Sequence, residues 1–290
     1  MRRTDFLSLA EVTLFTDWLA SELPHWPIHL DIGASKFVPQ GLQAKTVFGQ
    51  IIPLHYRWRA SGMSHGDWDE SCAKTRALSA ALRIGVANGD AAATMSACSD
   101  ILLWGGERNA AVGARPFLRA QGANLPAYIA QAGQAMSLAG GDLSTDFRSV
   151  QAMNSMLTKV HAFFAADGLP IYDSRVSAAM AALVEYWRSG TGQRVLPKSL
   201  QFPLAGGSAK PQHRLTWLFE KPISPGQLSY IHSETPARWA GAKLRLAWVM
   251  AEILRKAPDL FQEQHDRMRA LEAALFMVGY DLQCMQSSRR

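Results

Sequence analysis

The sequence predicts a mainly α-helical protein with a few short β-strands. Apolar residues recur at spacings of three and four over most of the chain, which is typical of amphipathic helices. Residues 28–60 and 193–236 lack this period, and we expect the short strands within them. We expect one unit over residues 1–290, made of an N-terminal segment (1–60), a helical core (61–192) and a loop-rich segment followed by C-terminal helices (193–290).

The first 150 residues predict three long helices and one strand. Helical patterns cover residues 6–23, 68–87 and 91–104, and prolines or an Asn-Gly-Asp break separate them. Residues 47–54 predict an edge strand, because the run is apolar and contains Pro53. Residues 55–59 then alternate aromatic and basic side chains, as do strands with one solvated face and surfaces that stack on bases. Short helices and loops are expected over residues 110–150.

The segment from Met153 to Trp187 predicts a helix, a short loop and a second helix. The first helix has an apolar face made of Met153, Met156, Leu157, Val160, Phe163 and Phe164. Lys159 falls at the edge of that face, where partial desolvation lowers the pKa of an amine and makes it a nucleophile. Gly168 and Pro170 end the first helix, and Asp173 is a natural N-cap for the second.

The last third of the chain predicts a long loop and two helices. Residues 193–236 are rich in Pro, Gly and Ser, with short strands expected at 200–202 and 214–219. So long a connection is usually functional. Helical patterns then cover residues 239–256 and 260–284.

Charge and cysteine content narrow the function classes. The net charge is +6 and the pI about 9.4, which favours a polyanionic partner. The three cysteines, Cys72, Cys98 and Cys284, lack metal-ligand spacing and predict free thiols in a cytoplasmic protein. We therefore expect no metal and no cofactor. We also expect no membrane segment and no obligate protein partner.

Two patches of sequence carry a resemblance to a known family. Thr158-Lys159-Val160 followed by Pro170-Ile171-Tyr172-Asp173 resembles the active-site segment of helix-hairpin-helix DNA glycosylases, in particular the bacterial 8-oxoguanine-glycosylase-like branch. Residues 101–106, Ile-Leu-Leu-Trp-Gly-Gly, resemble the "WGG" segment of the same group. The resemblance covers residues 95–190. The glycine-rich "L-P-G-V-G" hairpin of the family is absent, and residues 147–151 stand in its place. The gap from the lysine to the aspartate is also shorter than in the better-known repair enzymes.

The resemblance implies a helical glycosylase-like core that acts on double-stranded DNA. It implies that Asp173 stabilises the positive charge that develops at the sugar C1′ as the base leaves, and that Lys159 is the nucleophile. An amine that attacks C1′ leaves a Schiff base, which can then cleave the strand. Each residue also has a plain structural interpretation, since Asp173 can be a simple N-cap and Lys159 a lysine whose stem lies along apolar surface.

Further residues are candidates for contacts to the base or to DNA. For the base they are Trp104, Arg108, Asn109, Tyr230, His232 and Trp239. For the phosphates they are Arg57, Arg59, Arg175, Lys243 and Arg245.

Several functions remain open at the level of sequence. The leading hypothesis is a glycosylase for hypermodified cytosine in phage DNA, such as glucosylated 5-hydroxymethylcytosine. It rests on the long 193–236 segment, expected to open a roomy pocket rimmed by His213, Gln227, Ser229, Tyr230 and His232. The alternatives are an 8-oxoguanine repair glycosylase/lyase and a DNA-binding module without catalysis. An enzyme for another substrate is also open, because fold analogy does not fix function.

Overall fold

The protein is mainly α-helical, as predicted: of the residues that the structure describes, 57% lie in helices and 7% in strands. The computed structural model describes residues 1–107, 110–145, 147–206, 211–228 and 235–286. Within them the α-helices are α1 (Arg3–Leu7), α2 (Ala10–Glu22), α3 (Ile51–His55), α4 (Trp68–Ala87), α5 (Ala91–Trp104), α6 (Ala114–Ala120), α7 (Leu125–Ala135), α8 (Leu157–Phe164), α9 (Ser174–Gly190), α10 (Thr235–Lys256) and α11 (Arg267–Val278). The strands are β1 (Pro27–Ile32), β2 (Leu42–Val47), β3 (Leu204–Ala205) and β4 (Gln227–Leu228).

The strands lie elsewhere than the sequence predicted. Strands β1 and β2 form an antiparallel pair whose register runs from Pro27↔Val47 to Ile32↔Leu42. The predicted strand at 47–54 is wrong beyond Val47: a 3-10 turn over 48–50 leads into α3. Ile51 and Ile52 are both fully buried, which a helical turn allows and a strand of alternating faces does not. Pro53 lies in the first turn of α3, where its missing N–H is not needed.

The two strands predicted in the loop-rich segment are also wrong. Residues 198–200 and 215–217 form 3-10 turns, whereas the short parallel strands β3 and β4 lie at 204–205 and 227–228. Leu215 is buried but Trp217 is largely exposed and donates its indole N–H to Asp281. Leu215 and Trp217 would lie on the same face of a strand, so this difference in burial does not fit one.

Helix ends follow the capping residues. The bounds of α4 and α5 agree with the predicted ones, because the carboxylates of Asp67 and Asp90 accept hydrogen bonds from the Glu70 and Ala93 amides. Helix α8 begins four residues later than predicted, because the Asn154 side chain accepts hydrogen bonds from the two amides before Thr158. The predicted last helix is likewise shortened to α11, which begins after Asp266 and ends at Gly279.

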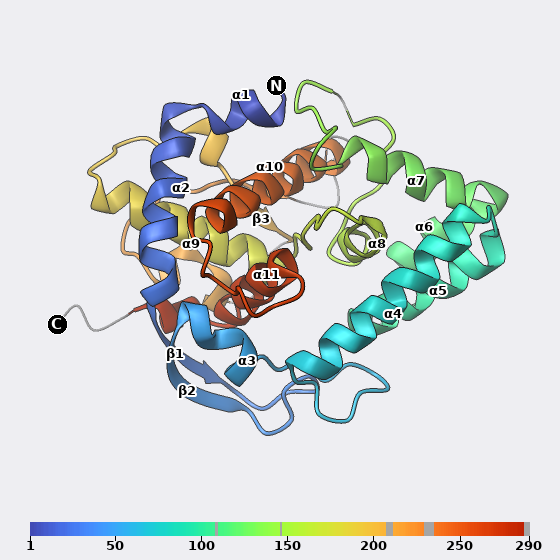
Figure 1. Cartoon of the computed structure of the whole chain (residues 1–290), viewed down its shortest axis with the longest axis horizontal. Helices are drawn as coiled ribbons and strands as arrows, with labels where there is room; N and C mark the ends of the chain where they lie inside the picture. The colour runs from blue at the N-terminus through green and yellow to red at the C-terminus, as the bar shows by residue number, and fades with distance from the viewer. Residues whose placement is uncertain (108–109, 146, 207–210, 229–234, 287–290) are drawn as a thin grey trace.

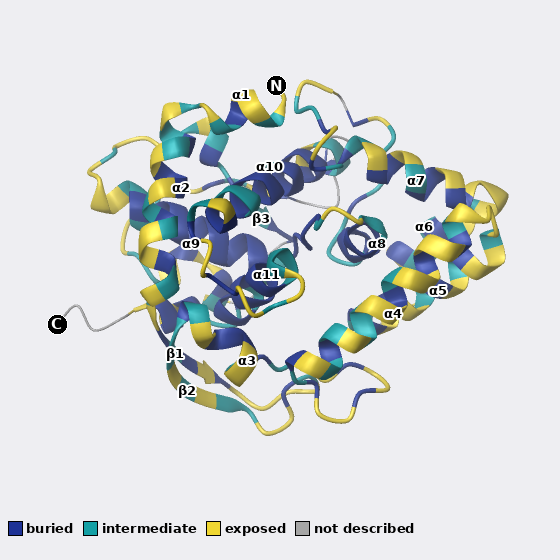
Figure 2. Ribbon diagram, viewed as in Figure 1, coloured by how far each residue is buried: buried dark blue, intermediate teal, exposed yellow. Residues whose placement is uncertain are grey.

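Helix α8 lies between two groups of helices (Figure 1). Helices α4, α5 and α7 pack on one side of it, and α9, α10 and α11 lie on the other. The buried residues concentrate in α8, α9 and α10 at the centre of the molecule (Figure 2). The buried apolar residues form one connected hydrophobic core, whose members range in sequence from Phe6 to Met285. All three predicted segments of the chain therefore contribute to it.

Candidate active site

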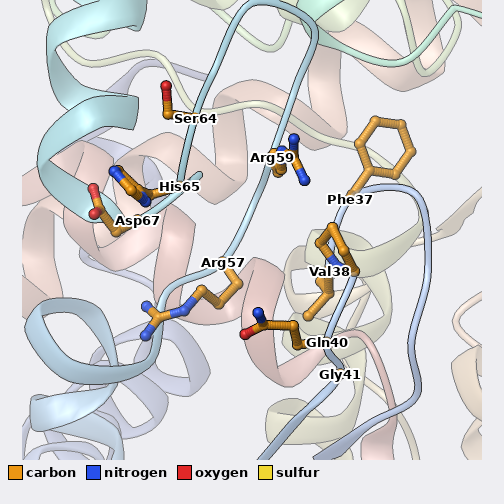
Figure 3. Close-up of a pocket in the computed structure, with 10 residues that line it drawn as sticks. Phe37, Val38, Gln40, Gly41, Arg57, Arg59, Ser64, His65 and Asp67 are labelled. Atoms are coloured by element: carbon orange, nitrogen blue, oxygen red, sulfur yellow. The ribbon is translucent and has the colours of Figure 1, made fainter.

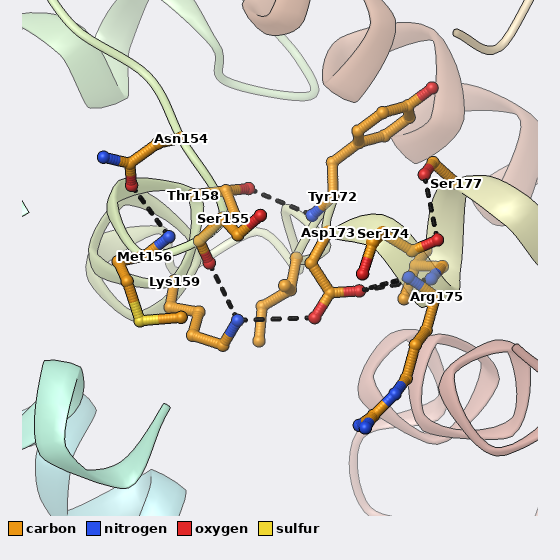
Figure 4. A network of polar contacts seen from close by, with 12 residues as sticks. Asn154, Ser155, Met156, Thr158, Lys159, Tyr172, Asp173, Ser174, Arg175 and Ser177 are labelled. Carbon is orange, nitrogen blue, oxygen red and sulfur yellow. Dashed lines mark hydrogen bonds and ion pairs between the residues drawn. The ribbon is translucent and has the colours of Figure 1, made fainter. Parts of the chain in front are cut away.

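The side chains of Lys159 and Asp173 point toward each other (Figure 4). Lys159 lies on α8, and Asp173 directly precedes α9. The Lys159 Nζ lies 3.3 Å from the Asp173 Oδ2 and donates a second hydrogen bond, of 2.8 Å, to the Ser155 carbonyl oxygen. Lys159 is only 4% exposed and Asp173 7%, so both lie deeper than the helix-edge position predicted for the lysine. The structure therefore brings together the two residues that the sequence singled out.

Asp173 is both a helix cap and a buried anion. Its Oδ1 accepts hydrogen bonds from the amides of Arg175 and Val176, which confirms the predicted N-cap. Burial would raise the pKa of this carboxyl group, but Lys159, Arg175 and the two amides together hold the pKa below its ordinary value of 3.8. Asp173 is therefore ionised at neutral pH and keeps one oxygen directed at Lys159.

The two glycines of the Trp-Gly-Gly segment make room for the site. A Cβ atom on Gly105 would lie 2.6 Å from the Cδ of Lys159, and one on Gly106 would lie 2.5 Å from the Phe37 ring. Gly106 also has a φ of +84°, which disfavours other residues. Both sequence patches that carry the family resemblance therefore meet at Lys159.

Lys159 and Asp173 line a small cavity that has an aromatic wall. Its volume is about 30 Å³, which is room for a single water molecule. Its aromatic wall consists of Tyr56, Trp58, Trp68, Trp104 and Phe276. The polar lining side chains are Ser71, Thr75, Lys159, Asp173, Arg269 and Glu272. Trp104, predicted to contact a base, thus lines the cavity, and its buried indole N–H has no hydrogen-bond acceptor among the described residues.

A second carboxylate in this cavity was missed at the sequence level. Glu272, on α11, is buried, accepts a hydrogen bond of 2.7 Å from the Ile171 amide, and forms an ion pair with Arg269. Burial raises the pKa of this carboxyl group, although Arg269 and the Ile171 amide act in the opposite direction. The signal was present, because Glu272 lies four residues after Met268 and three before Leu275, on the apolar face of its helix.

Arg175 lies on an aromatic surface next to the pair. Its guanidinium carbon is 3.6 Å from the ring centroid of Tyr280, 4.6 Å from that of Phe276 and 5.5 Å from that of Trp58. Such contacts hold a guanidinium in place by cation–π attraction. Arg175 therefore brings a fixed positive charge beside Asp173, at the N-terminus of α9.

The structure also has a larger, open pocket (Figure 3). Its volume is about 340 Å³, and Arg57, Arg59 and His65 are among its lining residues. Phe37 belongs to this pocket and lies face to face on Trp58 of the cavity, with ring centroids 3.8 Å apart. The predicted cations Arg57 and Arg59 therefore share a surface that borders the cavity.

Two of the predicted contact residues have other roles. Lys243 is completely buried and donates hydrogen bonds to Thr158, so it cannot reach a phosphate. Trp239 is also completely buried, does not line the cavity, and donates its indole N–H to the Tyr172 carbonyl oxygen. Both predictions are wrong, because α10 runs through the core and turns these side chains inward. Arg245 is half-buried and bonded to the Gln201 carbonyl oxygen, which leaves it poorly placed for DNA.

The other predicted base contacts are not described. Arg108, Asn109, Tyr230 and His232 lie outside the described residues. Ser229, of the predicted polar rim, lies outside them too. The described rim residues are His213, which is buried, and Gln227, on β4; neither lines the aromatic cavity. The roomy pocket expected from this segment is therefore not seen in the part of the chain that the structure describes.

Comparison with known proteins found no similarity. No protein-family model matches the chain, and no curated protein or solved structure was found to match it. Within residues 1–286, gaps aside, no three His, Cys, Asp or Glu side chains cluster in a way that could hold a metal ion. No helix in the described ranges is long and apolar enough to cross a membrane.

The glycine next to Trp104 provides a test of the site's packing. Gly105→Ala adds a methyl group against the Lys159 side chain, and we expect it to displace the amine and to cost about 1–3 kcal/mol of folding free energy. Chemical denaturation measures the cost. Gly190→Ala is the matched control, since a Cβ there meets nothing within 4 Å. Equal stability of the two variants would contradict the close approach of Gly105 to Lys159.

Proposed function

We propose that this protein is a DNA glycosylase, which flips a modified base out of double-stranded DNA and cleaves its N-glycosidic bond. The observation that carries the proposal is the buried Lys159–Asp173 pair at an aromatic cavity. An aromatic cavity suits a flipped base, which stacks between flat side chains. The resemblance of residues 95–190 to helix-hairpin-helix glycosylases supports the same function.

The reaction follows from the chemistry of the pair. Asp173 stays ionised and stabilises the positive charge that grows at C1′ in the transition state. The Lys159 amine, in its neutral form, bonds to C1′ while the electron pair of the N-glycosidic bond leaves with the base. The proton that the new C1′–N bond releases ends on the departing base. The sugar ring then opens: the C1′–O4′ bond breaks, O4′ takes its electron pair and a proton, and C1′ forms a double bond to the lysine nitrogen. This Schiff base allows strand cleavage by β-elimination, so lyase activity accompanies base release.

The open pocket provides a path for the DNA backbone. Arg57 and Arg59 line it, and its residue Phe37 lies against Trp58 of the cavity. A strand whose phosphates pair with the two arginines therefore passes beside the cavity. The cavity of about 30 Å³ is too small for a base, so its aromatic wall has to move apart when a base enters. The free cysteines Cys72, Cys98 and Cys284 suit a cytoplasmic enzyme.

We propose a bulky modified cytosine of phage DNA, such as its glucosylated hydroxymethyl form, as the substrate, which makes the enzyme a defence protein. The length of the 193–236 connection supports this proposal, because so long a connection is usually functional. A second candidate, 8-oxoguanine, is favoured by one observation: the cavity is small and one wall of it is aromatic, which suits a flat oxidised base.

A panel of modified duplexes tests the function and separates the substrates. The panel carries 8-oxoguanine, 5-hydroxymethylcytosine or glucosylated 5-hydroxymethylcytosine, and alkaline strand cleavage scores the abasic sites. We expect abasic sites on the duplex with the glucosylated base. Release of 8-oxoguanine alone would sink the defence proposal and favour repair. Tight binding without base release from any duplex would leave the DNA-binding module as the function.

The two arginines of the open pocket should set part of the salt dependence of DNA binding. Each phosphate contact adds about −0.9 to the slope of log K against log salt on B-DNA. We expect Arg57→Ala and Arg59→Ala each to reduce the slope by about that amount and to weaken binding to all sequences alike. Fluorescence anisotropy over a salt series measures this slope.

Arg2→Ala is the control, because the N-terminus lies at the opposite end of the view from the β1–β2 hairpin (Figure 1). A slope that neither pocket variant changes would count against this path for the DNA.

A further inference from the structure

Two side chains of α10 donate hydrogen bonds to the residues that directly precede Lys159 and Asp173. Lys243 donates hydrogen bonds of 2.6 Å to the Thr158 carbonyl oxygen and 3.1 Å to its Oγ1. Trp239 donates a hydrogen bond of 2.9 Å to the Tyr172 carbonyl oxygen. Thr158 directly precedes Lys159, and Tyr172 directly precedes Asp173. Helix α10 therefore contacts the residue before each member of the pair.

The spacing on α10 explains how one helix reaches both points. Trp239 and Lys243 are four residues apart and so lie on the same face of the helix. A third hydrogen bond, of 3.0 Å, runs from the Tyr172 amide to the Thr158 Oγ1 and ties the two held residues together (Figure 4). The result is a closed set of buried hydrogen bonds that spans α8, the loop before α9, and α10.

The cost of this arrangement indicates a function beyond packing. Lys243 is a fully buried lysine, and burial lowers its pKa well below the ordinary value. Its nitrogen bonds only to oxygens of Thr158 among the described residues, and no carboxylate lies within ion-pair distance of it. A leucine or methionine would fill the same space without the cost of burying an amine. What the amine adds is a fixed direction for the Thr158 carbonyl, and with it for the helix turn that carries Lys159.

We propose that Lys243 and Trp239 are positioning residues, which fix the distance between the Lys159 Nζ and the Asp173 carboxylate. The proposal rests on the glycosylase function proposed above, because positioning matters for a reaction. Neither side chain lines the cavity, so neither touches the base. Their removal should slow the chemical step and leave DNA affinity unchanged, since small misplacements of reacting groups cost on the order of 10²-fold in rate.

A second tryptophan on the same helix makes the test sharp. Trp248 is also fully buried, and it donates its indole N–H, over 2.9 Å, to the Leu138 carbonyl oxygen, which is no part of this hydrogen-bond set. Trp239→Phe and Trp248→Phe therefore remove the same group from the same helix at the same burial. We expect similar losses of thermal stability, but a single-turnover excision rate that falls on the order of 10- to 100-fold only for Trp239→Phe.

The lysine is tested in the same assay. Lys243→Met removes the amine and keeps an unbranched chain, and we expect a slower chemical step with DNA affinity near that of the wild type. Should this variant fail to fold, Thr158→Val removes the shared hydroxyl, and Thr158→Ser, which keeps it, should restore the rate. Equal slowing by Trp239→Phe and Trp248→Phe, or a wild-type rate in Lys243→Met, would overturn the proposal.

A readout without catalysis separates this inference from the proposed function. The Tyr172 amide is bonded to Thr158, so its hydrogen exchange should accelerate in Trp239→Phe and Lys243→Met, but not in Trp248→Phe. That pattern in a protein that releases no base would support the hydrogen-bond set and reject the glycosylase. Unchanged exchange in all variants would reject the positioning role whatever the substrate.

Discussion

Asp173→Asn should lower the rate of base release by about 10²- to 10³-fold or more, while DNA binding stays within a few-fold of the wild type. The asparagine can still accept hydrogen bonds from the Arg175 and Val176 amides, so α9 keeps its cap. What disappears is the negative charge that lies 3.3 Å from Lys159. Single-turnover kinetics on a cleavable duplex, together with anisotropy measurements of affinity, separate the two effects.

The same substitution at another helix cap controls for folding. Asp90 caps α5 through the Ala93 amide and lies on the surface, so Asp90→Asn makes the same chemical change far from any candidate function. We expect this variant to release the base at the wild-type rate. Asp173→Asn enzyme with undiminished base release would remove the carboxylate from the mechanism and leave it the role of a helix cap.

Local sequence patterns predicted several helices and the cap at Asp173, and the family resemblance paired Asp173 with Lys159. Asp67 and Asp90 are short polar residues placed just before apolar periodic runs, and they begin α4 and α5 where the sequence predicted. Asp173 begins α9 in the same way. The loop between α8 and α9 is short, which brings a lysine on one helix close to an aspartate at the start of the next. These features depend on neighbouring residues, and a sequence shows neighbours directly.

Long-range contacts could not be predicted in this way. Glu272 binds the Ile171 amide across 101 residues of sequence, and Trp58 joins the cavity from the segment 55–59, which is equally distant in the sequence. Lys243 was predicted to contact a phosphate, but it is completely buried. Lys243 lies four residues after Trp239 and four before Ala247, and both of these are buried. This spacing indicates that Lys243 lies on the inner face of α10. The burial of a charged residue depends on which helix covers it, and spacing alone does not give that.

Borohydride should trap a covalent adduct between the wild-type protein and a duplex that carries the excised base, and Lys159→Gln should form none. The Lys159 amine lines the cavity beside Asp173, so it is the amine placed to attack C1′. The buried lysine Lys243 donates its hydrogen bonds to Thr158 and does not line the cavity, so it is not placed to attack. Lys45, exposed on β2, gives the matched control, and Lys45→Gln should trap as the wild type does. Denaturing gels measure the adduct, and peptide mass spectrometry should place it on Lys159.

Base release by the wild type without any trapped species would make water the nucleophile and leave Lys159 to hold Asp173 in place. An adduct on another lysine would contradict the assignment of the site itself.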